Sequence, residues 1–178
     1  MIIGSGITIG AGIGLIPDLA PVVTTGLQLY LDAGNASSYP GSGTTWTDLT
    51  VNGRNGTLTN GPTYSGTNGG SIVFDGTNDF VQCTGSLTVT AATFVTWIRR
   101  NGNQGQYDGI LFSRGTNTTG MNFQASNQLG YHWNDAGNTY NWQSGLTIPD
   151  DMVYDCGFCY KHGSNGVSMS NGWNNYCH

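Results

Sequence analysis

The sequence predicts an all-β protein, and three observations carry that prediction. Glycine, threonine, asparagine and serine are abundant, whereas glutamate is absent: all ten acidic residues are aspartate, and Lys161 is the only lysine. Helical proteins favour Glu, Lys, Ala and Leu, because those side chains lose little rotamer freedom in a helix. β-Branched and aromatic residues recur in short alternating runs, the pattern of half-buried strands. Clusters of Gly and Asn separate the runs, as turns between antiparallel strands require.

The expected strands lie close together along the chain. In GLQLYLD (26–32), the three leucines share one face and Gln28 and Tyr30 the other. A turn-rich stretch over 33–70 follows, with Asn-Gly turns predicted at 52–53, 55–56 and 60–61. The later runs are SIVF (71–74), DFVQC (79–83), LTVT (87–90), TFVTWIR (93–99), GILFSR (109–114), MNFQ (121–124) and QLGYHW (128–133). This spacing predicts an antiparallel two-sheet sandwich, or jelly roll.

The composition divides the chain into three parts. Residues 1–24 form a Gly/Ile-rich N-terminal arm or linker, 25–150 the sandwich, and 151–178 an atypical tail. The arm has some strand character, which suits docking on a neighbouring protein by β-augmentation, and disorder is an equal alternative. It lacks the basic start of a signal peptide, and no run reaches the roughly 20 apolar residues that span a bilayer. We therefore expect no signal peptide and no transmembrane segment.

The charge pattern narrows the range of partners. The net charge is −5 and only 8% of residues are charged, so the surface consists mainly of neutral amides and hydroxyls. Nucleic-acid binding depends largely on Lys and Arg at phosphates, and binding to anionic lipid needs a polybasic patch. The sequence supplies neither. Neutral polar ligands, sugars above all, and other protein surfaces remain as expected partners.

Several runs resemble one known domain type. The run LYLDAGNASSYPGSGTTWTDLTVNGRNGTLTNGPTY (29–64), with GGSIVFDGTNDFV (69–81), resembles the opening of laminin-G-like domains of the concanavalin A-like lectin-glucanase superfamily. The form with LDAGN and YPGSGTTWTDL is similar to virion structural proteins of tailed phages. TFVTWIRR, YDGILFSRG and LGYHWND resemble later strands, so the resemblance covers about 26–150. It implies a β-sandwich that binds glycans, sometimes through calcium, or serves as a structural module, located in a virion or outside the cell.

Catalysis is not expected. Hydrolases of the wider superfamily use paired carboxylates, usually Glu, as nucleophile and general acid. This chain has no Glu, and no two Asp occur at a spacing that would place them opposite each other on one strand face. An Asp-based glycan hydrolase is therefore kept only as the weakest alternative.

Three aspartates are candidate calcium ligands. Asp75 and Asp79 flank Gly76 and Asn78 in FDGTNDF (74–80), where carboxylates and carbonyls would suit that hard cation. The alternative is a tight turn in which Asp75 accepts backbone hydrogen bonds. Resemblance to pentraxin-type relatives adds Asp108 as a ligand at the rim of the sandwich.

The segment GYHWNDAGNTYNW (130–142) is the candidate glycan site, because aromatic platforms and polar side chains alternate in it. The same alternation suits aromatic residues that face the core. The candidate residues are Tyr131, His132, Trp133, Asn134, Asp135, Tyr140 and Trp142.

The tail after Pro149 differs from the rest of the chain, and strand alternation stops there. Cys156, Cys159 and His162, with Cys177 or His178, suggest a zinc site, and disulfides are another alternative. We favour a third hypothesis, an out-of-frame translation of the last strands. After a one-base shift, Met152-Val153 gives Trp, and an apolar, β-branched string similar to the continuation of the phage-type domain becomes accessible. Sequencing the gene across codons 149–153 tests it, because a native frame there excludes the shift.

These observations predict two functions, in order of preference. The first is that of a non-enzymatic, virion or tail-associated structural protein with a lectin-like sandwich, which its N-terminal arm attaches to other virion proteins. The second is a calcium-assisted carbohydrate-binding module.

Overall fold

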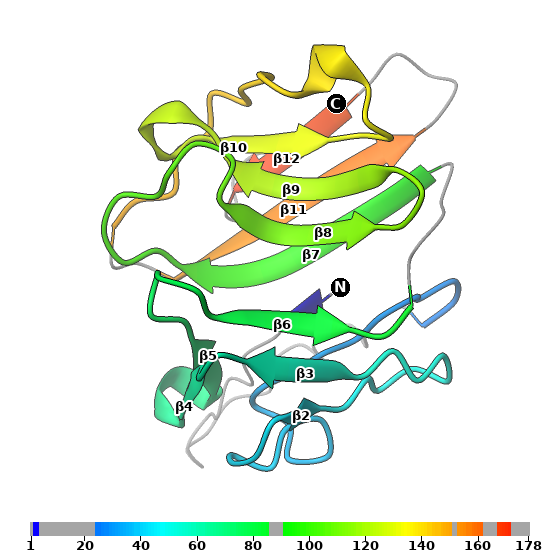
Figure 1. Cartoon of the computed structure of the whole chain (residues 1–178), viewed down its shortest axis with the longest axis vertical. Coiled ribbons are helices and arrows are strands. Elements are labelled where there is room, and N and C mark those ends of the chain that lie inside the picture. The colour runs from blue at the N-terminus through cyan, green and yellow to red at the C-terminus, as the bar shows by residue number, and fades with distance from the viewer. Residues whose placement is uncertain (1, 4–23, 86–90, 151–152, 162–166, 172–178) are drawn as a thin grey trace, which may run out of the picture. The chain divides into compact units, whose positions relative to one another are not determined.

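The computed structural model describes residues 2–3, 24–85, 91–150, 153–161 and 167–171 (Figure 1). These residues form antiparallel sheets and single-turn 3₁₀ helices, with no α-helix among them, which confirms the predicted all-β class. No helix in this part of the chain has the length and apolar character to cross a membrane. The chain separates into two compact units, Met1–Thr84 and Gly85–His178. The predicted arm lies outside the described residues except for residues 2, 3 and 24, and so does the predicted strand over 87–90.

The first unit contains short strands and one 3₁₀ turn. These are β1 (Ile2–Ile3), β2 (Thr45–Trp46), β3 (Gly56–Thr59), β4 (Thr63–Ser65), η1 (Thr67–Gly69), β5 (Ser71–Val73) and β6 (Phe80–Cys83). One sheet has the order β2-β3-β6, and β4 pairs with β5. The buried core of this unit consists of Leu29, Leu31, Ala33, Tyr39, Trp46 and Leu58.

The first predicted run is extended but is not a ladder strand. Leu29 and Leu31 are buried and Gln28 is exposed, as the alternation predicts. The backbone hydrogen bonds instead go to the segment around Asp48: the Tyr30 N–H donates to Asp48 Oδ1 over 2.9 Å, and the Leu49 N–H donates to the Tyr30 carbonyl over 2.9 Å. The Asp48 carboxylate and the Leu49 N–H therefore pair the backbone groups of Tyr30, which a neighbouring strand would pair in a sheet.

One predicted Asn-Gly turn is wrong. Asn55 Oδ1 accepts the Asp48 N–H over 2.9 Å, and Gly56 opens β3 opposite Cys83. A side chain at Gly56 would place its Cβ 2.6 Å from Val81 Cγ1, so glycine is needed here for close packing and not for a turn. The other two pairs are turns, with φ of 62° at Gly53 and 69° at Asn60.

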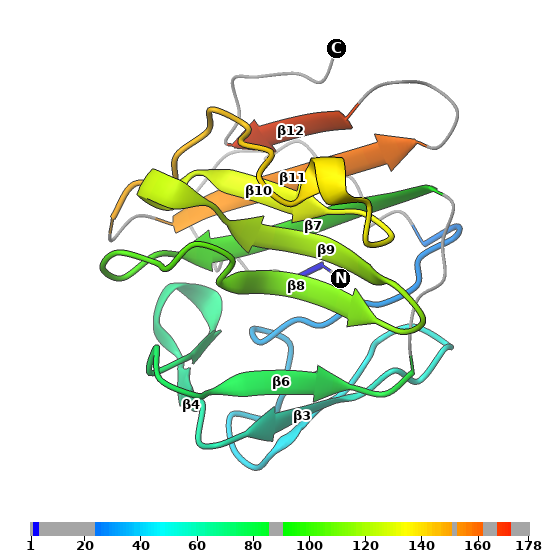
Figure 2. The ribbon, with the colours of Figure 1, turned by 45° about the horizontal axis from the view of Figure 1, so that its top comes forward.

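The second unit contains longer strands. These are β7 (Ala91–Arg99), β8 (Gly109–Arg114), β9 (Thr118–Phe123), β10 (Leu129–His132), β11 (Val153–Lys161) and β12 (Val167–Asn171), with 3₁₀ turns η2 (Ala125–Asn127) and η3 (Gly137–Thr139). One sheet has the order β10-β9-β8, and β11 pairs with β7 on one side and β12 on the other. Figure 2 shows these two sheets of the unit as layers, with β8–β10 in front.

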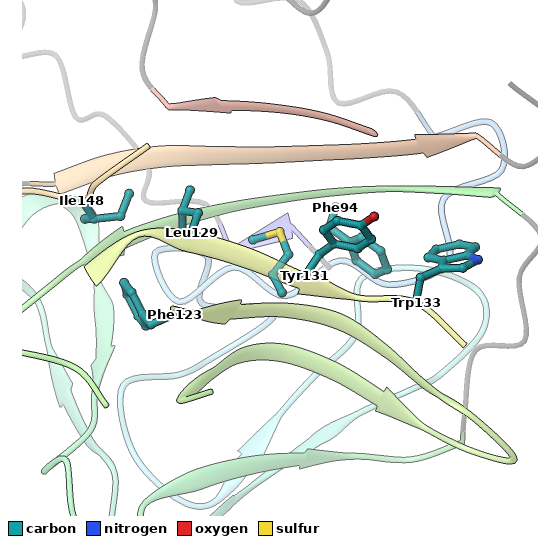
Figure 3. Close-up of a cluster of buried hydrophobic side chains, with 7 residues drawn as sticks. Phe94, Phe123, Leu129, Tyr131, Trp133 and Ile148 are labelled. Carbon is teal, nitrogen blue, oxygen red and sulfur yellow. The ribbon is translucent and has the colours of Figure 1, made fainter. Parts of the chain in front are cut away.

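One hydrophobic cluster occupies the space between these layers. Phe94 comes from β7, Met121 and Phe123 from β9, and the remaining buried members are Leu129, Tyr131, Trp133 and Ile148. Figure 3 shows the side chains in a row from Ile148 at one end to Trp133 at the other. Burial of these large apolar groups is the main stabilisation available to the unit, at roughly 1.5–3 kcal/mol for each side chain.

Two segments after Pro149 are strands, although no side-chain alternation in the sequence predicts them. All of β11 pairs antiparallel with β7, from Val153 opposite Arg99 to Lys161 opposite Ala91, and β12 then pairs with β11. A ladder along the whole of β7 satisfies the backbone groups of β11 whatever its side-chain pattern, and tertiary pairing overrides a weak alternation signal. The out-of-frame hypothesis concerns the gene and stays a prediction. Of the predicted zinc ligands, His162, Cys177 and His178 lie outside the described residues.

Candidate functional site

The β8–β10 sheet has one face in the core and a second face with a different character. Side chains alternate between the two faces of a strand, so Met121 and Tyr131, which are opposite each other, point into the core. The next row points to the other side and consists of Phe112, Gly120 and His132 in register. We call the rings on this side, Phe112 and His132 together with the contacting Tyr107 and Tyr140, the aromatic face.

Glycines in the sheet make room for side chains of this face. A Cβ at Gly120 would lie 2.7 Å from Phe112 Cδ1, and one at Gly109 would lie 2.8 Å from Phe112 Cε2, so the phenyl ring covers both glycines. At Gly130 an added Cβ would overlap the Gln124 side chain in the same way. The glycines therefore leave room for the Phe112 ring and the Gln124 amide to lie close to the sheet.

His132 is the centre of the aromatic face. Its ring centroid lies 4.2 Å from that of Tyr140, with an interplanar angle of 37°, and 6.0 Å from that of Phe112 in an edge-on arrangement. Tyr107 closes the third side, also edge-on, at 6.5 Å. Aromatic pairs favour such offset and edge-to-face geometries.

Neutral polar groups surround the rings. The Tyr107 hydroxyl donates to Asn141 Oδ1, and the Tyr140 hydroxyl donates to the Asp135 carbonyl over 3.1 Å. Gln106 Nε2 donates to Gln124 Oε1 over 3.2 Å, and Gln124 Nε2 donates to the Tyr140 carbonyl over 2.9 Å. These bonds fix the rings and leave amides and hydroxyls at the edge.

The electrostatics of the face favour a neutral ligand. Burial lowers the pKa of His132 below its usual value, the Asp135 carboxylate opposes this shift, and the Arg114 guanidinium reinforces it. A histidine with a lowered pKa is neutral at pH 7. Arg114 lies over the Phe112 ring, 5.2 Å from its centroid.

The structure corrects part of the predicted glycan set. Tyr131 and Trp133 lie in the core, with 7% and 4% of their surface exposed, so neither can touch a ligand. Trp142 is half-buried and packs edge-on against Tyr131 at 4.9 Å. Strand alternation explains this: when His132 points to the aromatic face, its two neighbours must point to the core. Only His132 and Tyr140 of the predicted set belong to the aromatic face.

Asn134 and Asp135 form a tight turn beside the face. Both have positive φ, 47° and 56°, which Asn and Asp tolerate better than most residues. Asn134 Oδ1 accepts from the Thr119 hydroxyl over 3.0 Å, and Asp135 Oδ2 accepts from the Thr118 N–H over 3.1 Å. Their side chains therefore hold the start of β9 against the turn that follows β10.

Sequence reasoning missed Tyr107, Phe112, Gly120 and Asn141. A signal existed for Phe112, because the alternation of GILFSR sends it to the side opposite Leu111, which packs on the core. No comparable signal existed for Tyr107, whose φ of 74° is unusual for a residue other than glycine.

The predicted calcium ligands of the first unit act as turn acceptors. Asp75 Oδ1 accepts the N–H groups of Thr77 and Asn78 over 2.8 and 3.4 Å, and Asp79 Oδ2 accepts the Asp75 N–H over 3.0 Å. Asp79 Oδ1 is buried and has no hydrogen-bond partner. Calcium requires six or more oxygen ligands, which these two carboxylates alone do not supply, and the calcium assignment stays a prediction.

Asp108, in the second unit, has a similar local role. Its Oδ2 accepts the Gly105 N–H over 2.6 Å, and its backbone carbonyl accepts the Phe123 N–H over 2.8 Å, beside the start of β8. Throughout the residues whose side chains the structure describes, no three His, Cys, Asp or Glu side chains gather closely enough to share a metal ion.

Comparison of the chain with protein-family models, with curated proteins and with solved structures gave no match in any of the three. The function is therefore inferred from the fold and from the aromatic face.

Proposed function

We propose that the chain is a non-enzymatic surface module, a lectin-like β-sandwich of the type carried by tailed-phage virions, which holds neutral glycans weakly on its aromatic face. The observation that carries the ligand class is the cluster of Phe112, His132 and Tyr140 rings on one face of the sheet, with Phe112 over Gly109 and Gly120 and neutral amides at the edge. The virion assignment is supported by the resemblance of residues 26–150 to such proteins.

A sugar suits this face for two physical reasons. The C–H side of a pyranose is apolar and flat, so it loses little hydration when it stacks on an aromatic ring. Its hydroxyls are both donors and acceptors, and they match the amides of Gln106 and Asn141 at the edge. Ligand sites commonly combine a mainly apolar surface with a few polar groups that fix orientation.

Binding at this face should be weak. Phe112, His132 and Tyr140 are each half-buried, so one sugar ring covers only a modest apolar area. A dissociation constant on the order of 1 mM corresponds to about −4.1 kcal/mol, which a single stacked ring with a few hydrogen bonds can supply. Many copies on one particle would raise the overall avidity without any new contact.

The sandwich architecture is supported by the second unit alone. Its two antiparallel sheets contribute to one cluster, with Phe94 from β7 and Met121 from β9 among the buried members. Packing of two sheets on a shared apolar layer is the usual way for an antiparallel protein to bury one face of each sheet.

A glycan array tests the proposal, with the wild type beside Phe112→Ala. We expect wild-type binding to a set of neutral glycans, unchanged by EDTA, and at least a tenfold loss in Phe112→Ala because the ring supplies the stacking surface. Phe74→Ala is the matched control, since Phe74 is an exposed phenylalanine of the first unit. Near-UV circular dichroism checks that both variants fold.

Two results would count against the proposal. Absence of binding by folded wild type leaves the module without a glycan role, and full binding by Phe112→Ala removes the aromatic face from it. Binding that EDTA abolishes would instead support the calcium-assisted alternative and return attention to Asp75, Asp79 and Asp108.

A further inference from the structure

Two polar atoms beneath the aromatic face have no hydrogen-bond partner. Asn122 is fully buried on β9; its Nδ2 donates to the Phe123 carbonyl over 2.9 Å, and its Oδ1 is unpartnered. His132 Nδ1 is likewise buried and unpartnered. His132 is opposite Gly120, two residues before Asn122 on the same strand, so both side chains belong to one face of the sheet. Buried polar atoms are normally paired, and an exception calls for an explanation.

The rings around His132 differ in how firmly they are held. Phe112 is half-buried and lies over Gly109 and Gly120. Tyr140 is also half-buried, and its hydroxyl donates to a backbone carbonyl. Tyr107 is the most exposed, at 46% of its surface, and its hydroxyl donates to the exposed Asn141.

The backbone of Tyr107 is fixed although its side chain is exposed. The Tyr107 N–H donates to the Phe123 carbonyl over 2.8 Å, and the Asp108 carbonyl accepts the Phe123 N–H over 2.8 Å. The φ of 74° at Tyr107 is a strained value that these bonds maintain. The ring can therefore swing away only by side-chain rotation, which in exposed residues takes picoseconds to nanoseconds.

We propose that Tyr107 is a gate, latched by Asn141, over a recessed subsite in which Asn122 Oδ1 and His132 Nδ1 bind hydroxyl groups of a neutral saccharide. This inference rests on the proposed glycan function. Hydroxyls are the fitting partners because they donate to the amide oxygen and can donate to or accept from the imidazole nitrogen in either tautomer. Opening the latch also frees Asn141 for a hydroxyl at the edge.

The gate is tested without any ligand by an NMR pH titration of His132. Asn141→Ala breaks the latch, and Tyr107→Gly removes the ring while suiting the positive φ. Burial is the main cause of the lowered pKa of His132, so both variants should raise that pKa toward its ordinary value, with Asp135 and Arg114 unchanged. Asn138→Ala, the same change at an exposed residue of η3, should leave it unaltered.

The subsite is tested by titrating glucose, galactose, mannose and their deoxy analogues into the same proteins. We expect Tyr107→Gly, which removes the gate and keeps the Asn141 amide, to bind one of the three hexoses about threefold to tenfold more tightly than wild type, because the open state is more populated. A deoxy analogue that lacks the hydroxyl facing the subsite should bind at least tenfold more weakly than its parent hexose.

The two tests separate the gate from the ligand. An unchanged His132 pKa in both variants overturns the gate, whatever the hexoses do. A raised pKa without binding of any hexose overturns the hydroxyl subsite together with the proposed function, and leaves Tyr107 as a gate. Equal binding of hexoses and all deoxy analogues would overturn the subsite while the glycan function stands.

Discussion

Gly120→Ala should destabilise the second unit by about 3 kcal/mol and eliminate the aromatic face. An added Cβ would overlap the backbone carbonyl of Leu111 and lie 2.7 Å from Phe112 Cδ1. The carbonyl belongs to β8 and has little room to shift, so overpacking at this point should disrupt the β8–β9 ladder, at the upper end of the usual 1–3 kcal/mol. Urea unfolding measures the loss, and the glycan array should show no binding.

Gly137→Ala is the matched control, because nothing lies within 4 Å of a Cβ built there and its φ is not positive. It should unfold at the wild-type urea concentration. A Gly120→Ala protein that is as stable as wild type would show that β8 and β9 do not approach as closely as the structure has them.

Asp48→Asn is expected to destabilise the first unit by about 3 kcal/mol. Asp48 is only 5% exposed, and its Oδ1 accepts the N–H groups of Tyr30 and Thr50 over 2.9 and 3.0 Å. Its Oδ2 accepts the Arg54 N–H and the Thr50 hydroxyl over 2.9 and 2.7 Å. An asparagine amide must direct its NH₂ at a backbone N–H in either orientation, so a buried donor loses its acceptor and faces another donor.

The same carboxylate makes stability depend on acid. Burial would raise the pKa of Asp48, but the hydrogen bonds from Tyr30, Thr50 and Arg54 together outweigh it and lower the pKa. Because the folded-state pKa is lower than the unfolded value of about 3.9, the charge stabilises the fold fully above that pH. The stabilisation is lost as the pH falls through the folded pKa, and wild type and Asp48→Asn should converge there.

Urea unfolding at neutral pH and at a series of acid pH values measures both effects. Asp75→Asn is the control, since Asp75 is exposed and an asparagine Oδ1 can accept the Thr77 N–H equally well. A constant difference in the free energy of unfolding between wild type and Asp48→Asn, down to the lowest pH, would contradict the stabilising role of the Asp48 charge.

Alternation predicted β7, β8 and β10 of the second unit and missed β11 and β12. The run GILFSR coincides with β8, and TFVTWIR and QLGYHW overlap β7 and β10. The same rule failed where hydrogen bonds from elsewhere replace a ladder. The leucines of 27–31 alternate in burial, yet the segment is held by the Asp48 carboxylate, 18 residues from Tyr30.

The segments LYLD (29–32) and TWTDL (45–49) have a structural role in the first unit. The Asp48 carboxylate accepts hydrogen bonds from backbone N–H groups. Ser38 Oγ accepts the Asp32 N–H over 3.1 Å and donates to the Thr47 carbonyl over 2.6 Å. These polar side chains hold turns together, which explains why a highly polar stretch packs around the buried Trp46.

The candidate site was predicted only in part. Sequence reasoning selected the segment 130–142 and included His132, because aromatic and polar residues alternate there. It could not decide which side chains face the core. Alternation shows that neighbouring side chains point to opposite faces, but it does not show which of the two faces is buried. Tyr107 lies 34 residues from its partner Asn141, and only the folded sheet brings the two together.

The most direct measurement of the central claim is backbone amide chemical-shift mapping with the saccharide that binds best on the array. We expect shifts concentrated at Phe112, Gly120, His132 and Tyr140, with the same pattern after EDTA. Shifts centred on Asp75 and Asp79 that vanish with EDTA would place the ligand at a calcium loop, and no shifts at saturating sugar would contradict glycan binding altogether.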